Sequence, residues 1–162
     1  QRRLPKVEPV GLRPLLEDLV ASAQASGAAR SIRVELAPGE LAWVEGEAFL
    51  LRRAIGNLLA NALDFSPEGG LVRVELLQRS RGVDIVVRDQ GPGIPDYADA
   101  RVFEKFYSLA RPHSNKKSTG LGLPFVKEIA ELHHGRVALR NGDGGGAVAT
   151  LSLPAIEAPP VA

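Results

Sequence analysis

Two asparagine side chains, those of Asn57 and Asn61, stand four residues apart in a stretch with helical periodicity. On a helix they would lie on one face, one turn apart. Asparagine has a low helix propensity, so a pair of asparagines in a helix suggests a functional role for their polar side chains. Carboxamide oxygens suit Mg²⁺, which takes oxygen ligands and keeps most of its waters. The pair is a candidate magnesium site, and two solvated side chains on a surface helix are the alternative.

A carboxylate at the end of an expected strand is the second candidate. Asp89 is followed closely by Gly91 and Gly93. A carboxylate only accepts hydrogen bonds, so it suits the exocyclic amine of adenine and would repel the carbonyl of guanine. The glycines would let the backbone approach a flat ligand. The alternative is a Gly/Pro turn with a capping Asp.

A glycine-rich turn that leads into a helix is the third candidate. It comprises residues 119–124, with Gly120 and Gly122. Free N–H groups at a helix N-terminus bind anions. The residues just before it are basic: Arg111, His113, Lys116 and Lys117. This pattern fits a mobile segment that closes on phosphates, although a solvated surface loop is the alternative.

An aromatic patch lies within the same loop-rich stretch. Phe103 and Phe106 are interpreted as anchors that tether the mobile segment to the body of the protein. Core packing is the more common role of paired Phe residues and stays the alternative.

The elements that must hold these residues follow from periodicity. Helices are expected over 12–25, 47–65 and 123–133, with a short helical piece near 98–106. Strands are expected over 32–36, 42–45, 72–77, 83–88, 136–140 and 147–153. Paired strands with helices between them predict an α+β two-layer sandwich, with one mixed sheet covered by helices on one face.

Composition excludes several classes of protein. The chain has 162 residues and a net charge of +1, which fits one domain and gives no electrostatic footprint for nucleic acid. It lacks an apolar run of membrane-spanning length, and Cys is absent, which excludes disulfides and thiolate metal sites. Met is also absent, so we expect a fragment of a longer protein, with residues 1–10 as a linker remnant and 155–162 as a disordered tail.

Two other motifs resemble known functional sites, but their sequence surroundings do not support that function. Residues 142–147 match the letters of a dinucleotide fingerprint, but they stand between two expected strands and are interpreted as a turn. His133 and His134 lack a His-Glu-x-x-His frame. They are interpreted as a helix end, where a cationic His is mildly favourable.

In order and spacing, these motifs resemble the catalytic and ATP-binding domain (HATPase_c, GHKL superfamily) of bacterial two-component sensor histidine kinases. The resemblance covers residues 11–154, with 57–65 as the N box, 89–94 as G1, 103–107 as F and 119–123 as G2. Residues 94–97 and 106–109 resemble the CreC-type branch. The resemblance implies a Bergerat fold, with a mostly antiparallel sheet of about five strands, about three helices on one face, and an ATP lid over 95–119.

The resemblance also implies roles for single residues. Asn61 would coordinate Mg²⁺ with Asn57 assisting, and these two would be the catalytic and metal residues. Asp89 would accept the adenine amine, and Phe65 would pack on the ring. The implied ATP-binding set is Asn61, Asp64, Phe65, Asp89, Gly91, Gly93, Ile94, Lys116, Lys117, Thr119, Gly120, Leu121, Gly122 and Leu123.

Three positions depart from the family pattern. Asp64 stands where many relatives place a phosphate-binding Lys, so Arg111, Lys116 or Lys117 would have to supply that charge. The resemblance places Val148 where the family often has a Thr near the adenine, with Thr150 two residues on. Pro124 at the helix start is sterically compatible.

The resemblance implies transfer of the ATP γ-phosphoryl group to a histidine on a separate dimerisation domain, and onward to a response regulator. Position 57 supports transfer over hydrolysis, because a carboxamide cannot take a proton from water as the Glu of related ATPases does. His113, His133 and His134 are not credible acceptors. The expected partners are ATP, the upstream domain of a homodimer and a receiver domain, without nucleic acid or membrane contact.

Two alternatives stay open. One is a degenerate ATP/ADP-binding module without catalysis, which Asp64 favours. The other is a serine kinase of the anti-sigma-factor type, which shares these motifs. For the histidine kinase, the expectation is a cytoplasmic domain of a bacterial inner-membrane protein.

Overall fold

The computed structural model describes residues 6–39, 41–93 and 122–160. In these ranges three α-helices and seven strands follow one another in the order β1 (Glu8–Gly11), α1 (Leu12–Gly27), the 3₁₀ turn η1 (Ala28–Arg30), β2 (Arg33–Leu36), β3 (Trp43–Gly46), α2 (Ala48–Phe65), β4 (Leu71–Gln78), β5 (Gly82–Arg88), α3 (Gly122–Leu132), β6 (Arg136–Asn141) and β7 (Ala147–Pro154). The three main predicted helices are confirmed to within a few residues. The short helical piece predicted over 98–106 lies outside the described residues.

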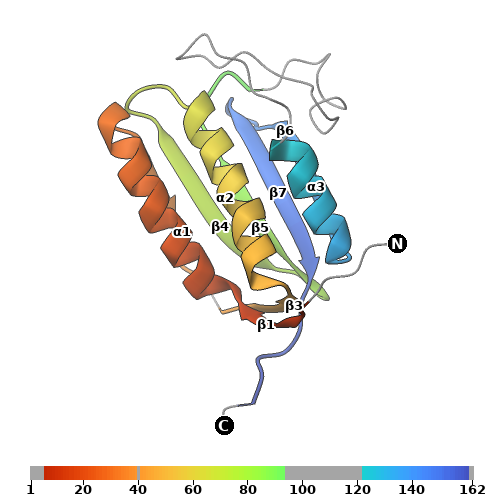
Figure 1. Cartoon of the computed structure of the whole chain (residues 1–162). Helices are drawn as coiled ribbons and strands as arrows, with labels where there is room; N and C mark the ends of the chain where they lie inside the picture. The colour runs from red at the N-terminus through yellow and green to blue at the C-terminus, as the bar shows by residue number, and fades with distance from the viewer. Residues whose placement is uncertain (1–5, 40, 94–121, 161–162) are drawn as a thin grey trace.

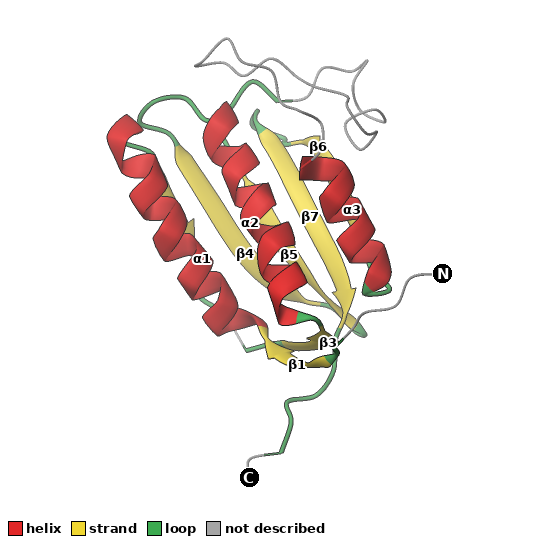
Figure 2. Cartoon of the chain, viewed as in Figure 1, coloured by secondary structure: helices red, strands yellow, loops and turns green. Residues whose placement is uncertain are grey.

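A five-stranded sheet carries the fold, with the strand order β2-β4-β5-β7-β6. β2 and β4 are parallel, and the other neighbours are antiparallel. All three helices lie against the same face of this sheet (Figures 1 and 2). The predicted two-layer sandwich with a mixed sheet is therefore confirmed.

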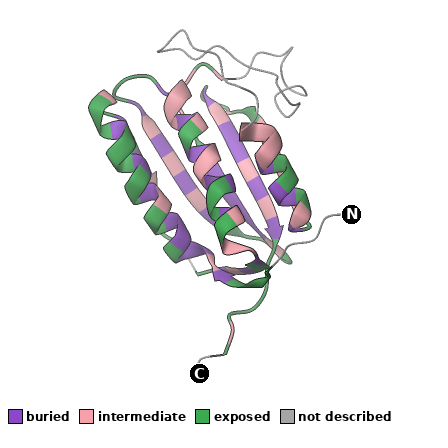
Figure 3. Cartoon of the chain, viewed as in Figure 1, coloured by how far each residue is buried: buried purple, intermediate pink, exposed green. Residues whose placement is uncertain are grey.

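The core fills the space between the helices and this face. Strand residues alternate between the two faces of a sheet, so Val72, Val74, Ile85 and Leu151 point toward the helices and are buried. α2 turns its apolar stripe toward them, and Figure 3 shows the buried surfaces of the helices facing the sheet. Each fully buried aliphatic side chain contributes roughly 1.5–3 kcal/mol, which makes this layer the main source of stability.

A second, two-stranded sheet lies at one end of the domain. β1 pairs antiparallel with β3, from Glu8 opposite Gly46 to Gly11 opposite Trp43. The boundary predicted at residue 11 therefore falls inside a strand. The N–H of Ile156 donates to the carbonyl of Trp43 at 2.8 Å, so the disorder predicted from residue 155 onward is wrong at this position. Both differences arise from backbone pairing between segments far apart in the sequence.

Defined caps fix both ends of α2. At its start, a carboxylate oxygen of Glu47 accepts a hydrogen bond of 2.7 Å from the N–H of Leu50. The helix ends at Phe65, and its C-cap residue, Ser66, is extended (φ −75°, ψ 143°) as expected before a proline. The Arg30 guanidinium donates hydrogen bonds to two carbonyls at this end of the helix, that of Leu63 at 2.9 Å and that of Ser66. These contacts hold the C-terminal turn, which includes Phe65, in place.

The helix end at His133 differs from the expectation of a cationic side chain. His133 is buried, and its Nε2 accepts a hydrogen bond from a backbone N–H. An accepting nitrogen carries no proton, so this imidazole is neutral. Only the exposed His134 fits the predicted helix-end role. Across the described ranges, the structure has no helix of the length and apolarity needed to cross a membrane.

Candidate functional site

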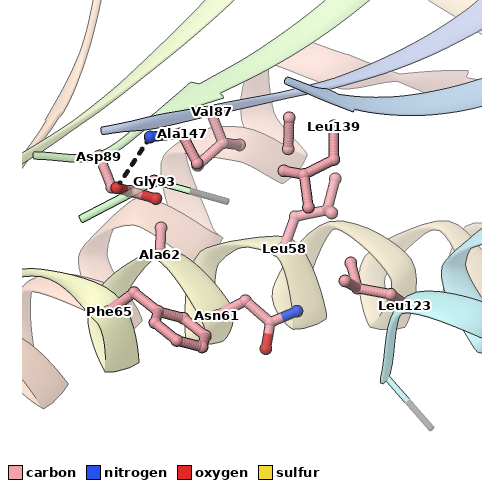
Figure 4. Close-up of a pocket in the computed structure, with 11 residues that line it drawn as sticks. Leu58, Asn61, Ala62, Phe65, Val87, Asp89, Gly93, Leu123, Leu139 and Ala147 are labelled. Carbon is pink, nitrogen blue, oxygen red and sulfur yellow. Dashed lines mark hydrogen bonds between the residues drawn. The ribbon is translucent and has the colours of Figure 1, made fainter. Parts of the chain in front are cut away.

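A hollow opens between α2, the start of α3 and one end of the sheet. Counted with the space at its mouth, it has a volume of about 620 Å³. The described part of its lining is mostly apolar, with two polar side chains. It comprises Leu58, Asn61, Ala62, Phe65, Val87, Asp89, Gly93, Leu123, Leu139, Ala147 and Ala149 (Figure 4).

α2 supplies one wall of the hollow. Its contributing residues recur at helical spacing, namely Leu58, Asn61, Ala62 and Phe65. Leu58 and Ala62 point toward the sheet, and Asn61 and Phe65 project side by side from the same helix (Figure 4). The helix therefore presents an apolar floor with one carboxamide and one aromatic ring beside it.

The sheet supplies the opposite wall. On β7, Ala147 and Ala149 point into the hollow. Val148 lies between them and faces the other side of the sheet, where it lines a separate hollow with Arg73 and Arg88. The expectation that Val148 takes the place of a Thr near the adenine is therefore wrong. Strand alternation gives the pocket positions to the two alanines.

Asp89 follows β5 and is the only carboxylate among the described residues that line this hollow. Its Oδ1 accepts hydrogen bonds from the backbone N–H groups of Gly91, at 2.8 Å, and Ala147, at 3.2 Å. Among the described residues no hydrogen bond reaches Oδ2, and Figure 4 shows the carboxylate beside Ala62 at the hollow. The free oxygen is therefore a ready acceptor for a ligand.

Burial changes the acid–base behaviour of this carboxylate. Removal from water raises the pKa of Asp89 above its ordinary value of 3.8. The two backbone hydrogen bonds, from Gly91 and Ala147, act in the opposite direction because they favour the ionised form. Burial is the larger effect, so Asp89 is a carboxylate whose charge lacks full compensation by the protein.

The two glycines after Asp89, Gly91 and Gly93, occupy positions where a side chain would clash or the backbone would be strained. A Cβ at Gly91 would overlap the carbonyl oxygen of Phe65, so the segment after β5 packs directly on the C-terminal end of α2. Gly93 has φ +83°, a left-handed conformation that favours glycine. This packing brings Asp89 and Phe65 to the same end of the hollow.

The start of α3 lies near Asn61. A Cβ built on Gly122, the first residue of the helix, would stand 4.0 Å from Asn61 Nδ2. Leu123 lines the hollow directly. An α-helix leaves its first N–H groups without intrahelical acceptors, so this end of the hollow offers backbone donors to an anion.

The structure brings together some of the predicted residues. Those that line the hollow are Asn61, Phe65, Asp89, Gly93 and Leu123. Those that are described but stand outside the lining are Asn57, Asp64, Gly91 and Gly122. Those that lie outside the described residues are Ile94, Phe103, Phe106, Lys116, Lys117, Thr119, Gly120 and Leu121.

Six lining residues were not predicted: Leu58, Ala62, Val87, Leu139, Ala147 and Ala149. Spacing could have found some of them, because Leu58 and Ala62 share a helical face with Phe65, and Val87 stands two residues before Asp89 on a strand. Leu139 and the alanines required the pairing of β5, β7 and β6.

The donor set fits a magnesium ion held mainly by its ligand. In the described part of the chain, no group of three or more His, Cys, Asp or Glu could hold a metal. Mg²⁺ keeps several waters and often binds through one or two protein groups plus phosphates. Asn61 can supply such an oxygen at the mouth of the hollow, whereas Asn57 stands one turn away from the lining.

Comparison with known proteins agrees with this geometry. Residues 46–157 match the model of the histidine kinase-, DNA gyrase B- and HSP90-like ATPase family. The sensor protein CreC of Escherichia coli (strain K12) is 47% identical over 126 residues, which cover 78% of this chain and 26% of CreC. This similarity agrees with the CreC-type pattern in the sequence. The chain spans about a quarter of that relative's length.

Solved structures share the fold. The ATP binding domain of PrrB from Mycobacterium tuberculosis is 30% identical, with a TM-score of 0.74 and coverage of 93% of this chain and 98% of that one. Full-length ShkA in complex with AMPPNP is 26% identical, with a TM-score of 0.83 and coverage of 97% and 32%. The chain therefore belongs to the histidine kinase-, DNA gyrase B- and HSP90-like ATPase family, among the catalytic domains of sensor histidine kinases.

Proposed function

We propose that the hollow binds Mg·ATP, and that the domain supplies the γ-phosphoryl group for autophosphorylation of a histidine on a dimerisation domain of the same kinase. The observation that supports this most strongly is the placement of Asp89 and Asn61 along one apolar hollow. A carboxylate at one end suits a base with an amine, and a carboxamide near a helix start suits a hydrated metal and phosphates.

The adenine would lie at the Asp89 end. Its exocyclic amine would donate to Oδ2, and Phe65 and the alanines of β7 would cover its faces. A ligand amine would restore part of the hydrogen bonding that burial removes from this carboxylate. Guanine would present a carbonyl to the same oxygen, so the site should discriminate against it.

The phosphates would lie toward Asn61 and the start of α3. Asn61 would hold Mg²⁺, with Asn57 assisting from the preceding turn, and Gly122 would contact the phosphates. Asp64, on the same helix and half-buried, would add no positive charge, so the basic residues Lys116 and Lys117 would be needed there. Phosphoryl transfer relies mostly on positioning and charge stabilisation, which this arrangement could supply.

Transfer to a side chain is favoured over hydrolysis. Asn57 is a carboxamide one turn before Asn61, where a general base for water would have to stand. The acceptor histidine would be supplied by an upstream dimerisation domain, and a receiver domain of a response regulator would take the phosphoryl group next. The domain would work on the cytoplasmic side of a bacterial inner membrane, as part of an intact sensor kinase.

The test uses this domain, the purified dimerisation domain of the same kinase and γ-labelled ATP. Acid-labile label on the dimerisation domain, dependent on Mg²⁺ and lost in Asp89→Asn, is the expected result. Tight ATP binding without any label would favour a degenerate nucleotide-binding module. Acid-stable label on a serine of an anti-anti-sigma protein would favour the serine kinase.

A further inference from the structure

The glycine-rich turn of residues 142–146, between β6 and β7, touches the base-recognition residue of the proposed function. The first residue after the turn is Ala147, whose N–H donates to Asp89 Oδ1 at 3.2 Å. Its carbonyl accepts from the N–H of Asp89 at 3.0 Å. Figure 4 shows the contact between Ala147 and the carboxylate. The rotamer of Asp89 therefore depends on where this turn places Ala147.

Gly146 sets that place by direct backbone contact. It is buried and has φ +75°, a conformation that other residues rarely adopt. A Cβ at this position would overlap the carbonyl oxygen of Asp89 and come within 2.8 Å of its carbonyl carbon. The close approach of the two backbones therefore requires glycine at position 146 for two separate reasons.

The rest of the turn holds Gly146 in this position. The N–H of Gly142 donates to the carbonyl of Gly146 at 2.9 Å, and the N–H of Gly145 donates to Gly142 at 3.2 Å. Just before the turn, Asn141 Oδ1 would stand 2.5 Å from a Cβ on Gly93. The β6–β7 connection thus packs on both ends of residues 89–93.

We propose that Gly146 is a positioning residue for base recognition. The contact between Gly146 and the Asp89 carbonyl fixes the position of the Ala147 N–H, which donates to Oδ1. Because Oδ1 is held in this way, Oδ2 points toward the amine of the nucleotide. The inference rests on the proposed function, because it concerns how that site recognises its base. A glycine run that sequence spacing assigns only to a turn thereby acts in nucleotide selection.

The experiment measures binding of ATP and of purine riboside triphosphate to the 162-residue chain by calorimetry. The second ligand has neither an amine nor a carbonyl at the base position that faces Asp89. A hydrogen bond to a charged group corresponds to about tenfold or more in affinity, so the native chain should prefer ATP by about that factor. In Gly146→Ala the ratio of the affinity for ATP to that for the purine analogue should fall toward one, while the affinity for the purine analogue stays unchanged.

Gly144→Ala is the matched control. Gly144 belongs to the same turn, is exposed, and has no heavy atom within 4 Å of an added Cβ. This variant should keep the native preference. If Gly146→Ala does not fold, Gly142→Ala decides by the same criterion, because its Cβ would meet the carbonyl oxygen of Gly145 at 2.9 Å and displace the turn.

An unchanged preference for ATP in the folded variant would overturn the positioning role. Equal weakening of both ligands would also overturn it, because that is the result of a purely structural change. A native chain that binds neither ligand would instead overturn the proposed function, and the inference with it. The two failures are therefore distinguishable in the same titrations.

Discussion

The imidazole of His133 joins the end of α3 to the start of α2 through Glu47. Its Nε2 accepts a hydrogen bond of 3.0 Å from the Glu47 N–H, and Nδ1 lies 2.8 Å from the Ile129 carbonyl, to which it donates. A Cβ on Gly46 would stand 2.7 Å from Nε2, so the chain leaves room for the ring. The two helices that border the hollow are therefore connected at the end of the domain opposite Asn61.

Replacement of this imidazole should destabilise the domain. His133→Ala removes two hydrogen bonds and leaves a cavity, so the free energy of unfolding should fall by about 2–4 kcal/mol. Chemical denaturation measures the change. His134→Ala is the control, because His134 is exposed and its replacement should alter stability by less than about 0.5 kcal/mol. Similar losses of unfolding free energy in both variants would show that the buried imidazole stabilises the domain no more than an exposed side chain does.

Asp89→Asn should separate stability from nucleotide binding. The Asn oxygen can still accept from Gly91 and Ala147, but the amide would then present donor hydrogens to the adenine amine. ATP affinity should therefore fall at least about tenfold, measured by calorimetry. Since burial raises the pKa of Asp89, the variant also loses a charge that disfavours folding.

The pH dependence of stability provides the check on that variant. A carboxyl whose folded pKa is raised contributes stability that is fully present below its unfolded value of 3.8 and is lost as pH rises through the folded pKa. Asp89→Asn should therefore be more stable relative to the native chain at pH 7 than near pH 3.8. Denaturation at both values, without nucleotide, measures this, and a constant difference would contradict the raised pKa.

Asn61→Ala should remove the effect of magnesium on ATP binding. In the native chain, we expect ATP affinity to be higher with Mg²⁺ than with EDTA, because the ion joins the Asn61 carboxamide to the phosphates. The variant should bind ATP equally in both conditions. Asn57 lies outside the lining, so the variant Asn57→Ala should keep most of the effect of magnesium on ATP binding. A full magnesium effect in Asn61→Ala would refute the metal role.

Two glycine substitutions should have opposite effects on stability. Gly56→Ala lies inside α2, where an added Cβ has only Leu19 Cδ2 at 3.9 Å, so the unfolding free energy should rise by about 0.5–1 kcal/mol. Gly91→Ala should lower it, because the Cβ would overlap the Phe65 carbonyl. Thermal unfolding of the two variants tests this, and a destabilised Gly56→Ala would contradict the open space at that position.

The sequence by itself determined most of the helices and strands, although not β1, and the identity of the polar residues. Apolar periodicity predicted α2 and β5, which place Asn61 on the helix and Asp89 directly after the strand. The order of the four motifs indicated the family. These features depend on residues close together in the chain, where helical and strand periods are visible without any partner.

Only the tertiary structure decided which side chains meet across longer distances. It turned Ala147 and Ala149 toward the hollow and Val148 away, because the register of β7 on β5 is a pairing between distant segments. It also joined His133 to Glu47, 86 residues earlier in the chain. Local periodicity specifies a face of an element, but the partner of that face depends on how the elements pack.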